Sequence, residues 1–480
     1  MKKIIAWLCL VVLLSVMVLA AVSCHDEGGN GPSQTTESVT KNELLSHIPE
    51  SDFDGYKFKV LSRAGEAYTR EIFDDGSSAE NINSAVFRRN SMIYDTYGVE
   101  IVLLTVDSPD EAAHTDEIRR SVQANDMAYD FALTHSLSGC ELAAEGFLYN
   151  WNTLPYLDYE QEWWNTDIID ALSVGDSLYV ASNDMTLHSM EYAWGMVYNT
   201  DLATDLELTH DVVEMVRNKE WTLENVSKIT IPIAHDLNGD SAMTDEDRYG
   251  FGYNWWGATI AMMYGADQPV TTRDSEGYPM LSFNTEKTIS VIEKLFALTY
   301  TNDSCMSAHS MGQVYPAFED DRILLTAIVM SELEGFRDMK SDFLILPIPM
   351  YDENQDRYQS LVDGHANIMC IPAYIDNPNL HGVVLEALAA LSHELVLPEY
   401  YDTTLMYKHA RDDDSREMLG IIMDGRTYDF GYLYDLGGMA FITYQLISGR
   451  SMNFSSAYVA NETTAVSELM TLLDAFGALE

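Results

Sequence analysis

A twelve-residue acidic loop carries the sharpest chemical signal in the sequence. Oxygen-bearing side chains fall at positions 1, 3, 5, 9 and 12 of the segment 236–247, a spacing that lets one short loop wrap a calcium ion. Calcium is a hard cation that takes many oxygen ligands in irregular geometry. The sequence therefore predicts a structural calcium site. Its expected ligands are the side chains of Asp236, Asn238, Asp240, Thr244 and Asp247 and the backbone carbonyl of Ala242.

Two positions depart from the usual calcium-loop pattern. Ser241 stands at the sixth position, where glycine is usual, and Asp247 stands at the twelfth, where glutamate is usual. The loop resembles those of dockerins, which also end in aspartate. A metal-free turn is the alternative, because Asp and Asn side chains often bond their own backbone. Dockerins pair two such loops and this sequence has one, which argues against a calcium-dependent adhesion or scaffold module.

The aromatic segment 250–257 is a second candidate site. Trp255 and Trp256 follow closely spaced glycines, and adjacent residues cannot share one face of a helix or strand. At least one of these indoles is therefore expected to point away from the local core. Aromatic rings stack on the apolar face of a sugar, while nearby polar groups bond its hydroxyls; core packing is the commoner fate of any single tryptophan. Further candidates for ligand contact are Tyr253, Tyr192 and Trp194.

Charge and motif content exclude several classes of function. The 480 residues carry a formal net charge of -49, from 27 Lys+Arg and 76 Asp+Glu. Such a surface repels nucleic-acid backbones and anionic lipid headgroups. The sequence contains no GxSxG, HExxH, GxxxxGK[ST] or GxGxxG signature, and we predict no enzyme. A surface glycoside hydrolase stays an alternative, because any pair of carboxylates is unremarkable among 76 acids.

The N-terminal segment predicts where the protein is located. Two lysines precede an apolar stretch over residues 4–22, the composition of a secretory signal. Small residues lead to Cys24, and the segment resembles the lipobox of bacterial lipoproteins, although Ala21 stands where leucine is usual. An uncleaved signal anchor is the alternative; either way the folded part lies outside the cytoplasm. We expect a signal peptide over 1–23, a lipidated Cys24 and a flexible tether over 24–51.

Hydrophobic periodicity beyond the tether predicts an α/β protein. The expected strands cover 56–60, 99–104, 129–133, 323–330 and 343–347. Three-to-four-residue apolar spacing predicts a helix over 82–97, ended by Gly98, and Asn377-Pro378 opens a long apolar helix from Leu380 to Leu395. The strand–helix–strand order implies a partly parallel sheet. The 47% hydrophobic content suits two domains better than one.

Several segments, taken in order, resemble family 1 extracellular solute-binding proteins, the capture subunits of ABC importers. The resemblance covers about residues 52–480, with a departure at Asp320-Asp321, where the family commonly has glycine. Each motif alone has low specificity, and the resemblance rests on their order along the chain. The matching segments are Tyr56–Ser62, Glu80–Asn90, Asp176–Leu202, Phe318–Leu325 and Leu346–Glu353.

The resemblance implies a two-lobed, periplasmic-binding-protein-like α/β fold with a hinge and an interlobe cleft. By that analogy, lobe 1 comprises 52–182 and 318–362, and lobe 2 comprises 185–316 and 363–480. Family ligands contact loops that follow lobe-1 strands, which here carry Arg63 and His135. Asp184 and Asp363 lie near the expected hinge crossings, where cleft residues concentrate.

Together these features predict a lipid-anchored receptor on the outer face of the cytoplasmic membrane. It is expected to close two lobes around a small solute and to deliver that solute to the permease subunits of an ABC importer. The tryptophans and the resemblance favour an oligosaccharide, and a peptide or polyamine is the alternative solute. We expect a monomer that binds no nucleic acid.

Overall fold

The computed structural model describes residues 44–480, except 109–110, 255, 309–310, 407–412 and 478–480. The chain divides into two compact units, residues 1–44 and 45–480, and the description below concerns the second. The predicted signal peptide, the lipidated Cys24 and the tether up to residue 43 lie outside the described residues, as does Trp255.

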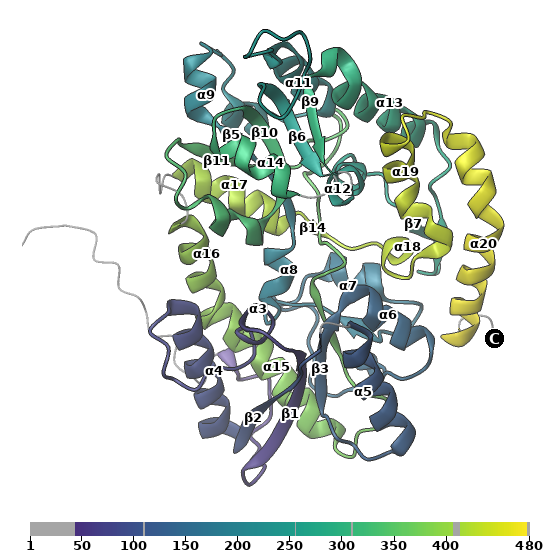
Figure 1. Ribbon diagram of the computed structural model, residues 1–480. Helices are drawn as coiled ribbons and strands as arrows, with labels where there is room; N and C mark the ends of the chain where they lie inside the picture. Colours follow the sequence, from purple (N-terminus) through teal and green to yellow (C-terminus); the bar gives the residue numbers. More distant parts are fainter. Residues whose placement is uncertain (1–43, 109–110, 255, 309–310, 407–412, 478–480) are drawn as a thin grey trace, which may run out of the picture. The chain divides into compact units, whose positions relative to one another are not determined.

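The first five-stranded sheet has the order β2-β1-β3-β13-β4, and Figure 1 labels its strands β1, β2 and β3. β1 pairs in parallel with β2 and with β3, whereas β13 runs antiparallel to β3 and β4. The sequence-predicted strands at 56–60, 99–104 and 129–133 are confirmed as β1, β2 and β3. The bounds are β1 Tyr56–Arg63, β2 Val99–Val106, β3 Phe131–His135, β4 Val180–Ala181 and β13 Asn367–Cys370.

The second five-stranded sheet has the order β11-β5-β10-β6-β9. β5 is antiparallel to both β10 and β11, while β6 pairs in parallel with β10 and β9. Every residue of β10 is buried, which explains its unbroken apolar sequence, since helices cover both faces of such a strand. The bounds are β5 Trp194–Asn199, β6 Tyr249–Asn254, β9 Cys305–Ala308, β10 Ile323–Val329 and β11 Phe343–Pro347.

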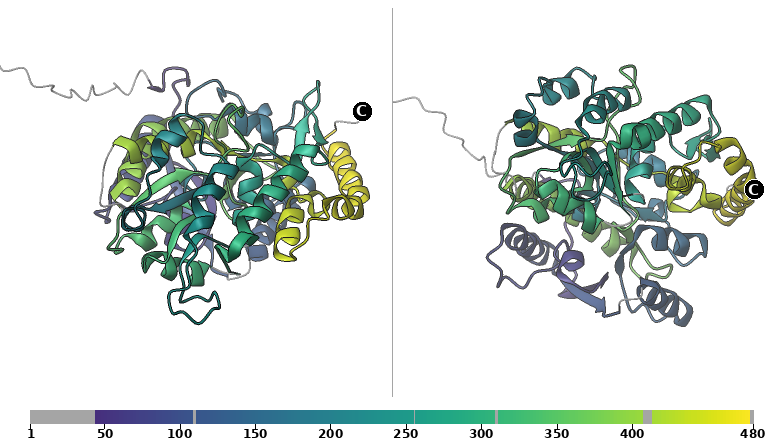
Figure 2. Two further views of the ribbon diagram at one scale, coloured as in Figure 1. Left: turned by 90° about the horizontal axis from the view of Figure 1, so that it is seen from above. Right: turned by 45° about the horizontal axis from the view of Figure 1, so that its top comes forward.

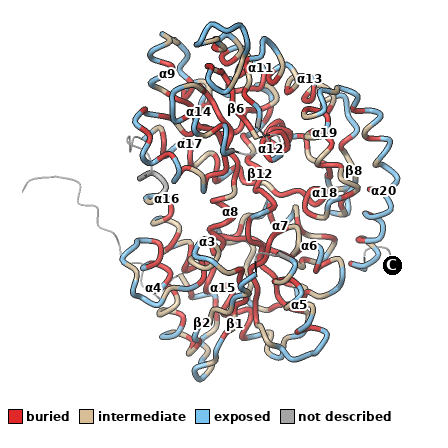
Figure 3. Tube along the Cα trace, viewed as in Figure 1, coloured by how far each residue is buried: buried red, intermediate tan, exposed pale blue. Residues whose placement is uncertain are grey.

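Helices cover both sheets, and buried residues concentrate along the strands and the inner helix faces (Figure 3). The helices of the first half are α3 Glu66–Thr69, α4 Asn81–Tyr97, α5 Glu111–Ala124, α6 Ser136–Ala144, α7 Thr166–Leu172, α8 Leu187–Glu191, α9 Thr200–Asp205, α10 Val212–Arg217 and α11 Leu223–Thr230. Those of the second half are α12 Gly257–Gly265, α13 Glu286–Tyr300, α14 Met311–Glu319, α15 Pro378–Leu395, α16 Leu397–Met406, α17 Asp413–Asp424, α18 Phe430–Leu433, α19 Ile442–Ser448 and α20 Phe454–Ala475.

Short 3-10 segments and two small sheets complete the second unit. The C-terminal helix α20, yellow in Figures 1 and 2, packs against η5. The parallel pair β12–β14 joins two segments that run between the large sheets. The 3-10 segments are η1 Trp151–Thr153, η2 Ile231–Ile233, η3 Thr301–Asp303, η4 Met330–Phe336 and η5 Leu436–Phe441, and the small strands are β7 Thr271–Arg273, β8 Pro279–Leu281, β12 Ser360–Leu361 and β14 Arg426–Thr427.

The two long helices that the sequence predicts are confirmed. α4 ends at Gly98, which adopts the left-handed conformation with φ 62° and donates its N–H to the Tyr94 carbonyl. A Cβ at this glycine would lie 2.4 Å from the Asp52 carboxylate, so a larger residue cannot replace it without movement. α15 begins with Pro378, and the Asn377 side chain caps it by accepting from the Leu380 N–H.

The stretch Pro378–Thr403 is long and apolar enough to cross a membrane, but 78% of its most apolar window is buried inside the protein. Residues 380–392 of α15 are buried around the whole helix, and α15 packs against α4. These features are typical of a central core helix of a globular domain.

The chain passes between the two sheets more than once, as expected for a two-lobed fold. The first crossing leads from β4 through α8 to β5, and the second from β11 through β12 to β13. A third runs along α15, α16 and α17, since α15 packs on α4 beside the first sheet and α17 packs on β11 of the second.

The pairing of the late strands corrects the expected division into lobes. Residues 318–362 were assigned to lobe 1, but β10 and β11 pair with β5 in the second sheet. Conversely, β13 falls within the 363–480 segment assigned to lobe 2, yet it pairs with β3 and β4 in the first sheet. The second crossing therefore lies after β11, and the third lies after α15.

The expected tether is also too long at its C-terminal end. Leu45 and Ile48 are each only 5% exposed, and the His47 ring bonds the Glu386 carboxylate of α15 at 3.1 Å. A flexible tether would leave these side chains in water. Residues 45–51 therefore belong to the folded body, because Leu45 and Ile48 are buried and His47 is bonded to α15.

Candidate functional site

The facing edges of the two large sheets bring several predicted residues together. Arg63 and His135 are the last residues of the parallel strands β1 and β3, so they lie at the same edge of the first sheet. Asn367, the first residue of β13, is paired with His135. Trp194 is the first residue of β5 in the second sheet. Ligands of open α/β sheets bind beyond the carboxyl ends of strands, which makes this edge the candidate site.

Arg63 is buried and fixed by several partners. Its Nε and Nη2 donate to Asn367 Oδ1 at 3.1 and 2.7 Å, and Nη2 also donates to the His365 carbonyl at 2.7 Å. The guanidinium lies 4.0 Å from the centre of the Tyr68 ring, a cation–π distance. Arg63 therefore joins the end of β1 to the segment that leads into β13.

Asp363 links the two sheets. Its Oδ2 accepts a hydrogen bond from Trp194 Nε1 at 3.1 Å, and its Oδ1 bonds His365 Nδ1 at 2.6 Å. Its own N–H donates to the Tyr192 carbonyl at 2.9 Å. Burial raises the pKa of Asp363, but the hydrogen bonds and charge of His365 and the bond from Trp194 outweigh it, so the pKa lies below its ordinary value. The carboxylate stays ionised.

Trp256 supplies an exposed aromatic ring from the second lobe. It is 41% exposed and stacks on Phe441 with ring centres 5.0 Å apart. This confirms that one indole of the 255–256 pair points away from the core. The next residue must be glycine, since a Cβ at Gly257 would lie 2.1 Å from the Trp194 ring. This close approach fixes the start of α12 against Trp194, and so sets Trp256 beside the Trp194–Asp363 link.

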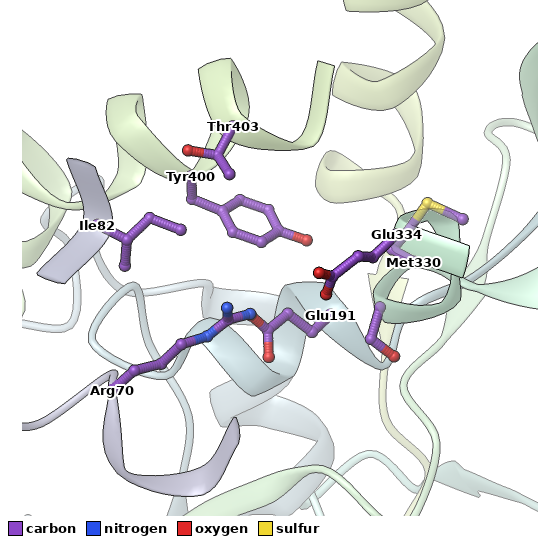
Figure 4. Close-up of a pocket in the computed structure, with 8 residues that line it drawn as sticks. Arg70, Ile82, Glu191, Met330, Glu334, Tyr400 and Thr403 are labelled. Atoms are coloured by element: carbon purple, nitrogen blue, oxygen red, sulfur yellow. The ribbon is translucent and has the colours of Figure 1, made fainter. Parts of the chain in front are cut away.

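An ion pair and a small cavity lie between α3–α4, α8, η4 and α16 (Figure 4). Arg70 points toward the buried Glu191 and donates to its carboxylate. Burial raises the pKa of Glu191 above its usual value despite the opposing effect of Arg70. The cavity has a volume of about 20 Å³, enough for a water molecule but not for a sugar. Its lining residues are Arg70, Ile82, Glu191, Met330, Ser331, Glu334, Tyr400 and Thr403.

The remaining predicted ligand residues lie in three different places. Tyr192 lies next to the site, since its carbonyl accepts from Asp363 and its ring packs against His188 at 5.1 Å. Tyr253 is fully buried and stacks on Phe251 with ring centres 5.6 Å apart. Its expected ligand contact is therefore corrected: the alternation of β6 turns this ring into the core of the second lobe.

Asp184 belongs to a separate cluster at the crossings. Its Oδ2 bonds His393 Nδ1 at 2.7 Å, and its Oδ1 lies 3.5 Å from an Arg426 nitrogen. Arg426 also donates to the Ser189 hydroxyl of α8 at 2.5 Å. These contacts join the segments after β4, at the end of α15 and along β14. The predicted position near a hinge crossing is confirmed, but the described contacts of Asp184 do not join it to the Asp363 group.

The predicted calcium loop is held by hydrogen bonds to its own backbone. Asp236 accepts from the N–H groups of Gly239 and Ser241 at 2.6 and 2.8 Å. Asn238 and Asp240 each accept from the N–H two residues on. The fully buried Asp247 accepts from Leu237 and Thr244 at 2.9 and 2.7 Å.

The geometry of this loop is that of a turn bonded to its own backbone. Among the described residues, no group of three or more His, Cys, Asp or Glu side chains is arranged to hold a metal. The side chains instead make the local Asx bonds of the metal-free alternative. Calcium binding by Asp236, Asn238, Asp240, Ala242, Thr244 and Asp247 stays a prediction.

Sequence reasoning missed several residues of this site. His365 is half-exposed beside Asp363, Tyr68 packs under Arg63, and Arg70 pairs with Glu191. His365 could have been found from the sequence, because it lies two positions after Asp363, which was already a candidate. The others depend on contacts between segments far apart in sequence.

Comparison with known proteins gives a fold rather than a close relative. No family model matches the sequence, and no curated protein matches it. Solved structures do match. The cyclic α-maltosyl-1,6-maltose-binding protein of Arthrobacter globiformis is 12% identical, with a TM-score of 0.57 over 86% of this chain and 98% of its own.

Two further matches have similar extents. The GacH receptor of Streptomyces glaucescens, solved unliganded and with acarbose, is 12% identical, with a TM-score of 0.53 over 88% of this chain and 99% of its own. The ABC substrate-binding protein Lmo0181 of Listeria monocytogenes, solved with cycloalternan, is 10% identical, with a TM-score of 0.52 over 88% of this chain and 100% of its own. The chain thus has the two-lobed α/β fold of ABC solute-binding proteins.

Proposed function

We propose that this protein is an extracytoplasmic receptor that captures an oligosaccharide between its two lobes and delivers it to an ABC importer. The observation that carries the proposal is the Trp194–Asp363 hydrogen bond at 3.1 Å. It joins the facing edges of the two sheets and gathers polar and aromatic groups from both lobes at one place. Arg63 and His135 come from the first lobe, and Trp256 comes from the second.

The chemistry of this group suits a sugar. Sugars need flat aromatic surfaces for their C–H faces and fixed polar groups for their hydroxyls. Trp256 offers an exposed ring, and polar groups at the edge of the first sheet are ordered by the Arg63–Asn367 and His365–Asp363 hydrogen bonds. The three solved proteins compared above are described as binding cyclic maltosyl-maltose, acarbose and cycloalternan. This supports an oligosaccharide as the class of solute.

Capture would proceed by hinge motion of the lobes. The cavity beside Arg70 holds only a water-sized molecule, so it is not the place where a sugar would bind. Closure would then be favoured by contacts that the solute makes with both lobes at once. In this mechanism the solute is bound and released unaltered, and the closed form docks on the permease subunits.

The location of the receptor follows from its N-terminal segment. We propose that Cys24 carries the lipid anchor and that residues 25–44 tether a monomeric body at the outer face of the cytoplasmic membrane. The lipobox-like sequence before Cys24 supports this, and so does the polar composition that follows it. Mass spectrometry of the membrane-extracted protein would reveal a diacylated Cys24 as the N-terminal residue.

Calorimetric titration of the purified full chain tests the proposed function. Linear and cyclic oligosaccharides form the first panel, with polyamines and peptides as the second, and each hit is repeated with W256A. We expect micromolar or tighter binding of at least one oligosaccharide and no new reducing ends after incubation. If only polyamines or peptides bind, the solute belongs to that class and not to the sugars. If reducing ends are released, the protein is a glycoside hydrolase and not a receptor.

A further inference from the structure

A buried tyrosine of the second lobe lines a cavity, and its hydroxyl has no hydrogen-bond partner. Tyr198 is 3% exposed and lines the cavity, and its hydroxyl is unpaired among the residues that the structure describes. Folded proteins rarely leave such a group unpaired, because burial removes the water that would otherwise bind it. Tyr253 also has an unpaired buried hydroxyl, but it lines none of the described cavities.

The cavity lies at the β11 edge of the second sheet. Its volume is about 370 Å³, which is in the range of small-molecule sites. Tyr198 on β5 pairs with Leu344 on the edge strand β11, and both residues line the cavity. Helix α9, labelled beside these strands in Figure 1, adds Thr200, Ala203 and Thr204. These elements belong to the second lobe alone, so binding here requires no closure of the lobes.

Hydrogen bonds fix two helices that form walls of the cavity. Asn199 caps α9, since its Oδ1 accepts from the Leu202 N–H at 2.8 Å. Asp211 caps α10 in the same way and accepts from the Glu214 N–H at 3.0 Å. A ligand that enters such a cavity orders little of the protein, and the cavity is therefore pre-organised for binding.

The hydroxyl groups of the lining restrict the kind of ligand. Thr200 Oγ1 donates to the Asp342 carbonyl at 2.8 Å, and Thr204 Oγ1 donates to the Thr200 carbonyl at 2.9 Å. Because a hydroxyl has one hydrogen, these two oxygens can only accept from a ligand. Burial raises the pKa of Tyr198 to about 12, so its hydroxyl stays neutral and can either donate or accept. A ligand that carries hydroxyl groups matches both requirements.

The charge and the apolar part of the lining favour a neutral ligand. The acid of the lining, Asp211, already caps α10, and His210 is exposed. The net charge of -49 repels anions. Aliphatic side chains can pack against the C–H groups of a sugar; those in the lining are Ala203, Leu208, Val212 and Leu344.

We propose that this cavity is a second binding site, which takes a neutral sugar unit and pairs one of its hydroxyls with the Tyr198 hydroxyl. The site goes beyond the proposed function, because it lies on one lobe and does not depend on capture between the two. A cavity of about 410 Å³ adjoins it and shares Thr209, His210 and Asp211, which leaves room for a second sugar unit. Such a site would hold a longer saccharide on the receptor whether the lobes are open or closed.

Carbon NMR of the purified full chain, labelled at the tyrosine rings, is the first measurement. The signal that is absent from Y198F identifies Tyr198. We expect glucose and maltose to shift this signal in the wild type and in W256A alike, while the Tyr253 signal stays in place. No shift of the Tyr198 signal with either sugar would overturn the site. A shift with spermidine or acetate but not with the sugars would overturn the neutral class of ligand.

Calorimetric titration with maltose in the W256A background is the second measurement, because that variant weakens the interlobe site. Y198F should lower the affinity about five- to tenfold, the size of one lost hydrogen bond. T204V removes an accepting oxygen and should also lower it. Y253F provides the matched control, since it removes an unpaired buried hydroxyl that lines no described cavity, and it should bind normally.

The two sites can fail separately. Equal affinity of Y198F, T204V and Y253F would mean that the interlobe site alone binds the sugar, and would overturn the second site without affecting the receptor. If W256A binds every sugar of the panel as the wild type does, the interlobe site is contradicted, while the Tyr198 signal still decides the second site.

Discussion

His393 and Asp184 form a 2.7 Å hydrogen bond at the place where three segments pass between the lobes. His393 lies near the end of α15, Asp184 follows β4, and Arg426 on β14 lies 3.5 Å from the same carboxylate. The bond to Asp184 raises the pKa of His393 above its ordinary value, and burial opposes this rise. The pair therefore couples protonation to the stability of the hinge region.

The sign of the pH effect follows from the raised pKa. A histidine with a raised pKa in the folded state stabilises the fold fully below its unfolded pKa of about 6.5. That contribution is lost as the pH rises through the folded pKa. Because the His393 side chain is 27% exposed, we expect roughly 1 kcal/mol or less.

Urea unfolding at pH 5.5 and pH 8.5 checks this prediction. H393Q should lower the free energy of unfolding at pH 5.5 more than at pH 8.5, whereas H210Q, which alters an exposed histidine, should leave both values unchanged. An equal loss at both pH values would mean that His393 stabilises the hinge through packing alone. The acids nearest to His393 are Asp184, Glu162 at 3.9 Å and the adjacent Glu394, so D184N should flatten the pH dependence most.

A buried carboxylate on α15 should be critical for the first lobe. Glu386 accepts from Trp163 Nε1 and Trp164 Nε1, each at 2.9 Å, and bonds the His47 ring at 3.1 Å. An amide in its place turns one acceptor into a donor that faces another donor. We expect E386Q to destabilise the protein by about 2–4 kcal/mol.

Chemical unfolding of E386Q beside E394Q measures this effect, since Glu394 is an exposed acid at the end of the same helix. H47A should cost less, about 1 kcal/mol, because the two indoles keep the carboxylate paired. If E386Q unfolds like the wild type, the carboxylate is not the group that orders the indoles and the N-terminal end of the folded body.

Local sequence patterns were enough to predict the two long helices α4 and α15 and the strands β1, β2, β3, β10 and β11. The helix over 82–97 and its stop at Gly98 follow from apolar spacing and from the need for a left-handed residue. β10 and β11 were found as strands from their apolar runs. These signals work because each depends on residues a few positions apart.

Local patterns could not predict which of the two sheets the strands β10, β11 and β13 join. β10 and β13 are both short and entirely buried, and nothing local distinguishes the first sheet from the second. The burial of the Tyr253 ring in the core of the second lobe was missed for the same reason. Asp363 meets Trp194 across 169 positions, and a contact of that range is decided by the fold.

The calcium loop makes a prediction about thermal stability. If Asp236 and Asp240 bind calcium, the ion should raise the melting temperature and a chelator should lower it, because ligands of the folded state stabilise it. D240N should remove the response with little change in the metal-free protein.

A thermal-shift series with calcium, magnesium and chelator checks the loop. D247N provides a contrast, since the buried Asp247 carboxylate accepts two backbone N–H bonds. It should lower the melting temperature with or without calcium. Identical melting curves for the wild type in calcium and in chelator would contradict the metal site and favour the metal-free turn.

Trp256 and Tyr253 should behave oppositely in a binding experiment, although they lie three residues apart. Trp256 is 41% exposed and stacks on Phe441, whereas Tyr253 is fully buried. W256A removes an exposed aromatic surface and should weaken oligosaccharide binding about five- to tenfold. Y253F keeps the packed ring and should leave the affinity unchanged. Calorimetric titration of both variants distinguishes them, and unfolding curves provide the control for stability. A loss of affinity in Y253F but not in W256A would mean that the ligand contacts Tyr253 rather than Trp256.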